Sequence, residues 1–126
     1  MERLLEYKIE VFDKEGYVYI NFLGDWLKGQ GDQILGEILE LVLASQHKRA
    51  IVDYSESGRM DSDKTMDYTE AKNASTLPDV HKCKFACLFR PEEMERFHFW
   101  ETVALNRGIR MKVFGVEQDA LTWLTQ

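Results

Sequence analysis

Long apolar runs, prolines, cysteines and cationic side chains are all scarce in this sequence. None of its apolar runs approaches the roughly 20 residues that a membrane-spanning helix needs. The first residues, Met-Glu-Arg-Leu-Leu-Glu, contain no apolar core of the kind found in a signal peptide. We therefore expect a cytoplasmic protein without a membrane span.

The chain has only two cysteines, Cys83 and Cys87. On a β-strand their side chains would share a face but lie about 13 Å apart, at about 3.3 Å per residue, which is too far for a disulfide. No second pair of Cys or His residues accompanies them at a spacing typical of metal sites. The cysteines are predicted to be reduced core residues, and no metal site is expected.

Cationic residues are outnumbered by acidic ones. The chain has 16 Lys and Arg against 22 Asp and Glu, which gives a formal net charge of −6. Such a surface repels phosphates on average, so neither nucleic acid nor an anionic membrane is expected as a partner. The apolar fraction of 44% is typical of a globular protein. The length indicates one domain spanning residues 1–126.

The first half of the sequence predicts a hairpin, a helix and a central strand. Alternating apolar and polar residues indicate strands at 5–11 and 17–23, joined by a turn at 13–16. The glycines of residues 24–31 predict a loop, which would place Trp26 on the surface. A wide apolar stripe predicts a helix over 32–46 with Asp32 as its N-cap, and residues 50–52 form the apolar run of a central strand.

The second half alternates helices with strands. Helices are predicted over 62–76, 92–106 and 117–124, and strands over 84–89 and 109–114. Pro91 is typical of the first position of the middle helix, and Gly108 of its end. Helical connections between strands imply parallel pairing. The expected fold class is α/β in the order ββαβαβαβα, with a mixed central sheet made from the N-terminal hairpin and parallel crossovers, and with helices packed on it.

Residues 51–62 join the central strand to the next helix, and this is where open α/β sheets usually place binding residues. Asp53 ends the strand and either caps the following loop or contacts a partner. Ser62 begins the helix and either caps its first amides or is phosphorylated. Tyr54 and Arg59 flank the same loop, where they would offer an aromatic ring and a positive charge to a partner.

The same stretch resembles the STAS family, the sulfate transporter and anti-sigma factor antagonist domains. These domains have an Asp after their central strand and, about seven residues later, Met-Asp-Ser at the start of a helix, as this chain does at Asp53 and Met60-Asp61-Ser62. Its C-terminal half is similar to the small SpoIIAA-like proteins in Pro91-Glu-Glu, in Arg107-Gly108 and in its Ala-Leu-x-Trp-Leu end.

The resemblance implies a STAS-like fold and a regulatory module that binds a protein partner such as an anti-sigma-type kinase. It implies that Ser62 is the phosphorylation site. The recognition surface would then include Asp53, Tyr54, Arg59, Met60 and Asp61.

The predicted helix over 92–106 has more large apolar side chains than one helix face can bury, because Phe97, Phe99 and Trp100 span more than one face. Three placements are open for these residues: all in the core, on a homodimer surface, or in the wall of a pocket.

STAS-like proteins are similar to the CRAL-TRIO lipid-binding fold. One alternative function is therefore a carrier of a small apolar ligand or lipid, with Trp26 also in its pocket; a homodimer without ligand is another. A carrier predicts an apolar cavity of a few hundred Å³ under this helix.

No pattern typical of an enzyme active site occurs. The three histidines, His47, His81 and His98, fall in different predicted elements. No nucleophile elbow, P-loop or dinucleotide-binding glycine motif is present. We therefore expect no catalytic activity and no cofactor.

Overall fold

The N-terminal hairpin is the first element of the computed structural model, which describes residues 7–27, 29–61 and 63–126. β1 (Tyr7–Asp13) pairs antiparallel with β2 (Val18–Trp26). Gly16 in the turn between them has a φ of +89°, a left-handed conformation that glycine adopts without steric cost. The predicted hairpin is confirmed.

β2 continues to Trp26, three residues beyond the predicted strand. The prediction that Trp26 lies on the surface was wrong, because its side chain is only 4% exposed. Its ring contacts Phe22 and Tyr54 at centroid distances of 5.9 and 5.8 Å. Its backbone pairs with Met60 in β4 (Ser57–Met60). Gly24, which suggested a loop, is accommodated within the strand.

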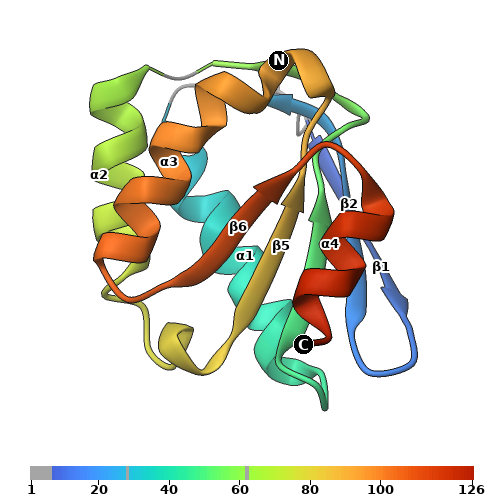
Figure 1. The fold of residues 1–126 in the computed structure, drawn as a ribbon. Coiled ribbons are helices and arrows are strands. Elements are labelled where there is room, and N and C mark those ends of the chain that lie inside the picture. The colour runs from blue at the N-terminus through green and yellow to red at the C-terminus, as the bar shows by residue number, and fades with distance from the viewer. Residues whose placement is uncertain (1–6, 28, 62) are drawn as a thin grey trace, which may run out of the picture.

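Three further strands, β3 (Arg49–Asp53), β5 (Lys84–Leu88) and β6 (Arg110–Phe114), complete the sheet. The strand order is β1-β2-β3-β5-β6, and every pair after the hairpin is parallel (Figure 1). β4 was not predicted; it pairs with the second half of β2, whose first half pairs with β3. The expected mixed sheet of a hairpin and parallel crossovers is confirmed.

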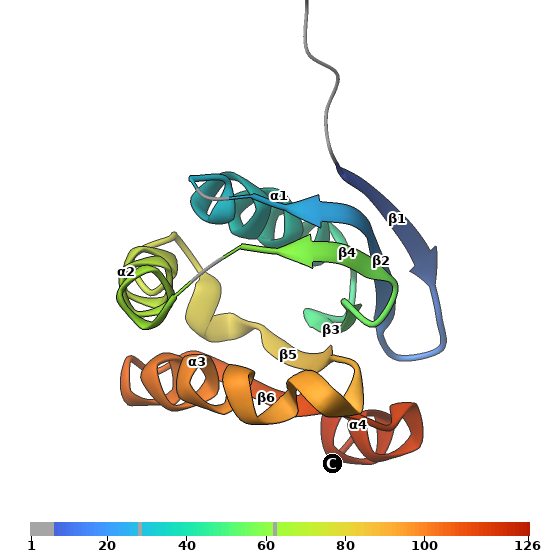
Figure 2. The same ribbon diagram turned by 90° about the horizontal axis from the view of Figure 1, so that it is seen from above.

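Helices lie on both faces of this sheet (Figure 2). α1 (Gly31–Ala44) and α3 (Met94–Asn106) pack on one face, with α2 (Lys64–Ala74) between them, and α4 (Glu117–Leu124) packs on the other. Short 3-10 turns at Val80–Lys82 and Pro91–Glu93 precede β5 and α3. Within the described part of the chain, no helix has both the length and the apolar character to cross a membrane.

The bounds of α4 agree with the prediction, whereas the start of α1 does not. α1 begins at Gly31, with Gln30 at the cap position and no side-chain hydrogen bond there. Asp32 therefore lies in the first turn and is not the predicted N-cap. In the first turn its carboxylate still faces the positive end of the helix dipole.

The sheet separates two apolar cores. The larger lies between the sheet and α1, α2 and α3, and the smaller lies under α4. Stacked rings run through the larger core from Tyr54 to Phe89 to Phe97, with centroid distances of 5.0 and 4.0 Å. Cys83 and Cys87 are free and buried, as predicted, and burial raises the pKa of both thiols. Thiols in that state are poor nucleophiles.

Candidate functional site

The turn between β3 and β4 is organised by the carboxylate of Asp53. One of its oxygens accepts hydrogen bonds from the backbone N–H and the hydroxyl of Ser55, at 2.8 and 2.6 Å. The other accepts the hydroxyl of Tyr19 from β2. Asp53 is only 8% exposed. Its side chain thus caps the turn, the first of the two roles that the sequence left open for it. Burial, together with the Asp53 charge, raises the pKa of Tyr19.

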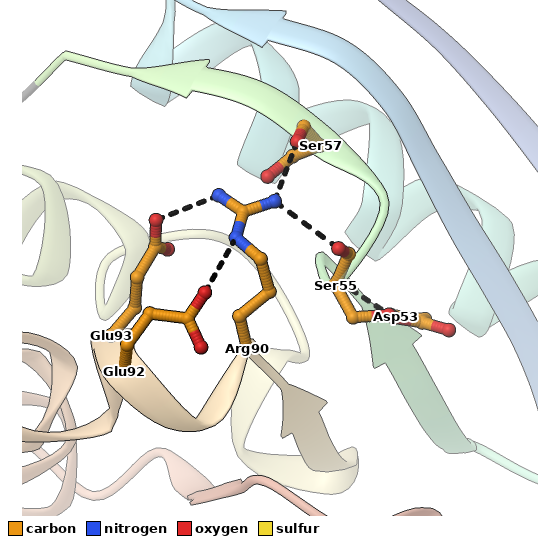
Figure 3. A network of polar contacts seen from close by, with 6 residues as sticks. All are labelled: Asp53, Ser55, Ser57, Arg90, Glu92 and Glu93. Carbon is orange, nitrogen blue, oxygen red and sulfur yellow. Dashed lines mark hydrogen bonds and ion pairs between the residues drawn. The ribbon is translucent and has the colours of Figure 1, made fainter.

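Arg90 connects this turn to the start of α3 (Figure 3). One of its terminal nitrogens donates to the backbone oxygens of Ser55 and Ser57, at 3.1 and 2.7 Å. The other donates to the Glu93 carboxylate at 2.7 Å, and its Nε lies 3.9 Å from a carboxylate oxygen of Glu92. One guanidinium therefore holds together two loops at the carboxyl ends of β3 and β5.

The sequence did not predict a role for Arg90. Its partners on the β3–β4 turn are backbone oxygens, which leave no trace in the pattern of side chains. The only signal was its position directly before Pro91-Glu-Glu, since a cation at that position can pair with acids in the first helical turn.

Arg90→Ala is expected to lower the free energy of unfolding by about 2 kcal/mol. The substitution removes two hydrogen bonds to backbone carbonyls and the cation beside Glu93, whose second carboxylate oxygen is already buried without a hydrogen bond among the described residues. Urea denaturation at pH 7 measures the loss. Arg110→Ala, which removes an exposed guanidinium from β6, should cost less than about 0.5 kcal/mol. An equal loss for both variants would contradict this role of Arg90.

α2 begins two residues later than predicted, at Lys64. Its N-cap is Asp63, whose carboxylate accepts the backbone N–H of Met66 at 2.9 Å. Asp63 thus occupies the cap position that the sequence analysis assigned to Ser62. Ser62 itself lies outside the described residues, as does the side chain of Arg59.

The residues just before Ser62 are anchored to the core. The backbone N–H of Asp61 donates to the carbonyl of Trp26 at 2.7 Å, and Met60 is partly buried against the larger core. Asp61 is partly exposed. Of the five predicted recognition residues, the structure thus places Asp61 at the surface next to the start of α2.

A groove of about 550 Å³ lies between the first turns of α2 and α3. Four acidic residues line it, together with Arg96 and the partly buried ring of Phe99. Asp63, the cap of α2, is one of these acids, so the groove reaches the start of α2. The four acids are Asp63, Asp67, Glu92 and Glu95.

Two buried carboxylates on α2, Asp67 and Glu70, were not predicted from the sequence. They are only 4% and 7% exposed. Burial, followed by the charges of Asp67 and Asp32, raises the pKa of Glu70 to about 7, although a hydrogen bond with Trp26 lowers it in part. Across the described residues, no group of three or more His, Cys, Asp or Glu could hold a metal ion.

Glu70 explains why residue 31, the first of α1, is a glycine. A Cβ built there would overlap the Glu70 carboxylate. Asn73, one helical turn further along α2, donates to the Asp32 carboxylate at 3.0 Å. Glu70 and Asn73 thus give α2 polar contacts with the start of α1.

Most of the aromatic residues proposed for a surface lie in the core. Tyr54, proposed as a partner contact, is 2% exposed, because the turn after Asp53 directs its ring between Phe22 and Phe89. Phe97 and Trp100, proposed with Trp26 for a dimer or ligand surface, are 5% and 9% exposed. Phe99 is partly buried and is the one residue of that set with access to the α2–α3 groove.

An apolar cavity of about 50 Å³ lies beneath α3 and next to α1 and α2. Trp100, Ala104 and Tyr54 contribute to its walls, which contain almost no polar atoms. Its volume is well below the few hundred Å³ that a lipid carrier needs. In this conformation the cavity accommodates at most a very small apolar molecule.

Several solved structures are similar to the chain. An anti-sigma factor antagonist from Mycobacterium paratuberculosis has a TM-score of 0.61 and 16% identity, with 95% of each chain covered. An uncharacterized protein with a SpoIIAA-like fold from Shewanella loihica has a TM-score of 0.55 and 18% identity, with 98% of each chain covered. The anti-sigma factor antagonist SpoIIAA in its unphosphorylated form has a TM-score of 0.50 and 16% identity, over 94% of this chain and 96% of that one.

No family model matches the sequence, and no curated protein matches it either. The likeness to the solved structures lies in the fold, and at that level it confirms the resemblance to STAS-like domains. The chain is therefore an α/β domain with the SpoIIAA-like fold that these anti-sigma factor antagonists also have.

Proposed function

We propose that the protein is a non-enzymatic regulatory module that binds a protein partner at the start of α2. The α2–α3 groove is the observation that supports this proposal most directly, because three exposed acids and the partly exposed ring of Phe99 line it close to Asp61. A partner segment with one apolar side chain and cationic neighbours would match it. The fold shared with anti-sigma factor antagonists makes an anti-sigma-type kinase the first partner to test.

Ser62 is the proposed switch of this module. It stands between Asp61 and Asp63 in the sequence, directly before the N-cap of α2. Phosphorylation would add about −1.5 to −2 charges there. Docking would remove water from this position, and the cost of desolvating a phosphate flanked by two carboxylates would outweigh its attraction to cations of the partner. Phosphorylation is therefore expected to release the partner.

Native mass spectrometry of the protein from its own host is the first test of this switch. Free protein should contain a fraction heavier by one phosphate, mapped to Ser62, and the protein in complex should lack the phosphate. Affinity capture with purified partner should then be at least about tenfold weaker for Ser62→Asp and unchanged for Ser62→Ala. Thr122→Asp on α4 adds the same charge to an exposed position on the opposite face of the sheet and should bind normally. Equal capture of Ser62→Asp and wild type would contradict the switch.

A further inference from the structure

A second groove, of about 450 Å³, runs along the outer side of α1 and shares no lining residue with the α2–α3 groove. α1 forms one wall, and the loop after α2 forms the other with Leu77 and Pro78. It lies outside the surface proposed above for the regulatory partner. A function for it is therefore independent of that proposal.

The α1 groove has an apolar floor and an acidic rim. Leu39, Leu43 and Leu77 lie in the floor, and Leu43 and Leu77 are only partly buried. Asp32 and Glu40 on the rim are exposed, and Glu37 is partly exposed. α1 contains no Lys or Arg, so no cation on the helix itself neutralises the rim.

Gly36, in the middle of α1, also lines the α1 groove. A glycine inside a helix costs stability relative to alanine. A Cβ built at Gly36 would meet nothing within 4 Å, so no contact among the described residues requires a glycine there. Gly31 is different, because a Cβ there would overlap Glu70. A glycine on an open helix face allows the backbone of another helix to approach closely.

We propose that the α1 groove binds a cationic amphipathic helix of a partner protein. Apolar residues at helical spacing on that partner would cover Leu39, Leu43 and Leu77, and its Lys or Arg side chains would lie against the acidic rim. The two helices would cross closest at Gly36. This is the helix-in-groove mode of recognition.

Other occupants fit this surface less well. A second copy of the chain has a net charge of −6, and no helix in the described part of the chain contains more than two Lys or Arg, so acidic surfaces would repel each other. Nucleic acid and anionic membranes would be repelled for the same reason. An extended peptide would find no free strand edge at this groove, because its walls are a helix and a loop.

The test uses an 18-residue synthetic peptide with leucines at positions i, i+3, i+4 and i+7 and lysines elsewhere, labelled with fluorescein. Nitrogen-15-labelled protein titrated with it should show amide shift changes concentrated at residues 32–43 and 77–78. A peptide of identical composition, scrambled to remove the leucine stripe, should bind at least about tenfold more weakly, because it has no apolar face to cover the floor. Shift changes concentrated on the α2–α3 groove would overturn this proposal and leave the proposed function intact.

Substitutions at Gly36 distinguish docking from a structural role. Gly36→Ala should raise the melting temperature by a few degrees, since it removes a helix-interior glycine. The same change should weaken peptide binding several-fold, and Gly36→Leu should abolish it by filling the crossing point. Glu40→Gln should weaken binding, whereas Glu15→Gln, an equal charge change in the hairpin turn, should not. Unchanged anisotropy curves with Gly36→Leu would overturn the proposal.

Discussion

Tyr54→Ala is expected to lower the free energy of unfolding by about 3–5 kcal/mol, which would leave a domain of this size close to unfolded. The ring is 2% exposed and lies among three others, with centroids 5.6 Å from Phe22, 5.8 Å from Trp26 and 5.0 Å from Phe89. Its removal leaves a cavity between the rings of Phe22, Trp26 and Phe89. Urea denaturation followed by tryptophan fluorescence measures the loss.

Tyr68→Ala is the matched control for this prediction. Tyr68 lies on the outer side of α2 and is 44% exposed, and Arg107 contacts its ring and its hydroxyl. Its removal should cost less than about 1 kcal/mol. If Tyr54 were a partner contact, as the sequence suggested, Tyr54→Ala would reduce binding while stability stayed near that of Tyr68→Ala. That result would refute the core position.

The sequence predicts most of the sheet and helices because their local signals agree with their tertiary contacts. The alternation at Val18, Ile20 and Phe22 indicates a half-buried strand, and these three side chains are buried in β2. β4 gives no such signal, because Ser57–Met60 contains a glycine and two polar residues. It becomes a strand only because β2 extends beyond β3 and presents backbone groups to it.

The candidate site is predictable in part, for the same physical reason. The role of Asp53 in the turn could be read from its position, since a carboxylate after a strand has amides of the next residues within reach. The contact between Arg90 and that turn could not be predicted from the sequence, because it depends on backbone oxygens 33 and 35 residues away in the chain. The same is true of Glu70, whose burial depends on the glycine at the start of α1.

The polar attachment of α2 has a consequence for the proposed switch. Ala71 is the one apolar residue of α2 that is fully buried among those described, and the helix also buries Asp67 and Glu70. Because the apolar burial on α2 is small, the charge state of its buried carboxylates is expected to affect how stably the helix is held. The helix that follows the proposed phosphorylation site in the sequence is thus expected to respond to added or removed charge.

Glu70→Gln is therefore expected to raise the free energy of unfolding at pH 8 by up to about 3 kcal/mol, and to change it little at pH 5. Burial raises the pKa of Glu70 from its ordinary 4.5 to about 7 in the folded protein. Between these two pH values the folded protein keeps a proton that the unfolded chain has lost. Stability from this group consequently falls as pH rises from about 4.5 to 7, and the cost of burying the carboxylate is complete above 7.

Thermal and urea denaturation of both proteins across pH 5–8 tests this directly. The glutamine retains an acceptor for Trp26 and removes the charge that Asp67 and Asp32 repel, so the gain should grow with pH and level off above 7. Glu95→Gln, an exposed acid on α3, should shift stability by less than about 0.5 kcal/mol at every pH. A loss of stability for Glu70→Gln at pH 8 would mean that the ionised carboxylate stabilises the start of α1 as a helix cap. In that case the buried negative charge on α2 would stabilise the helix, and phosphorylation next to it would not act on a helix that its own charges destabilise.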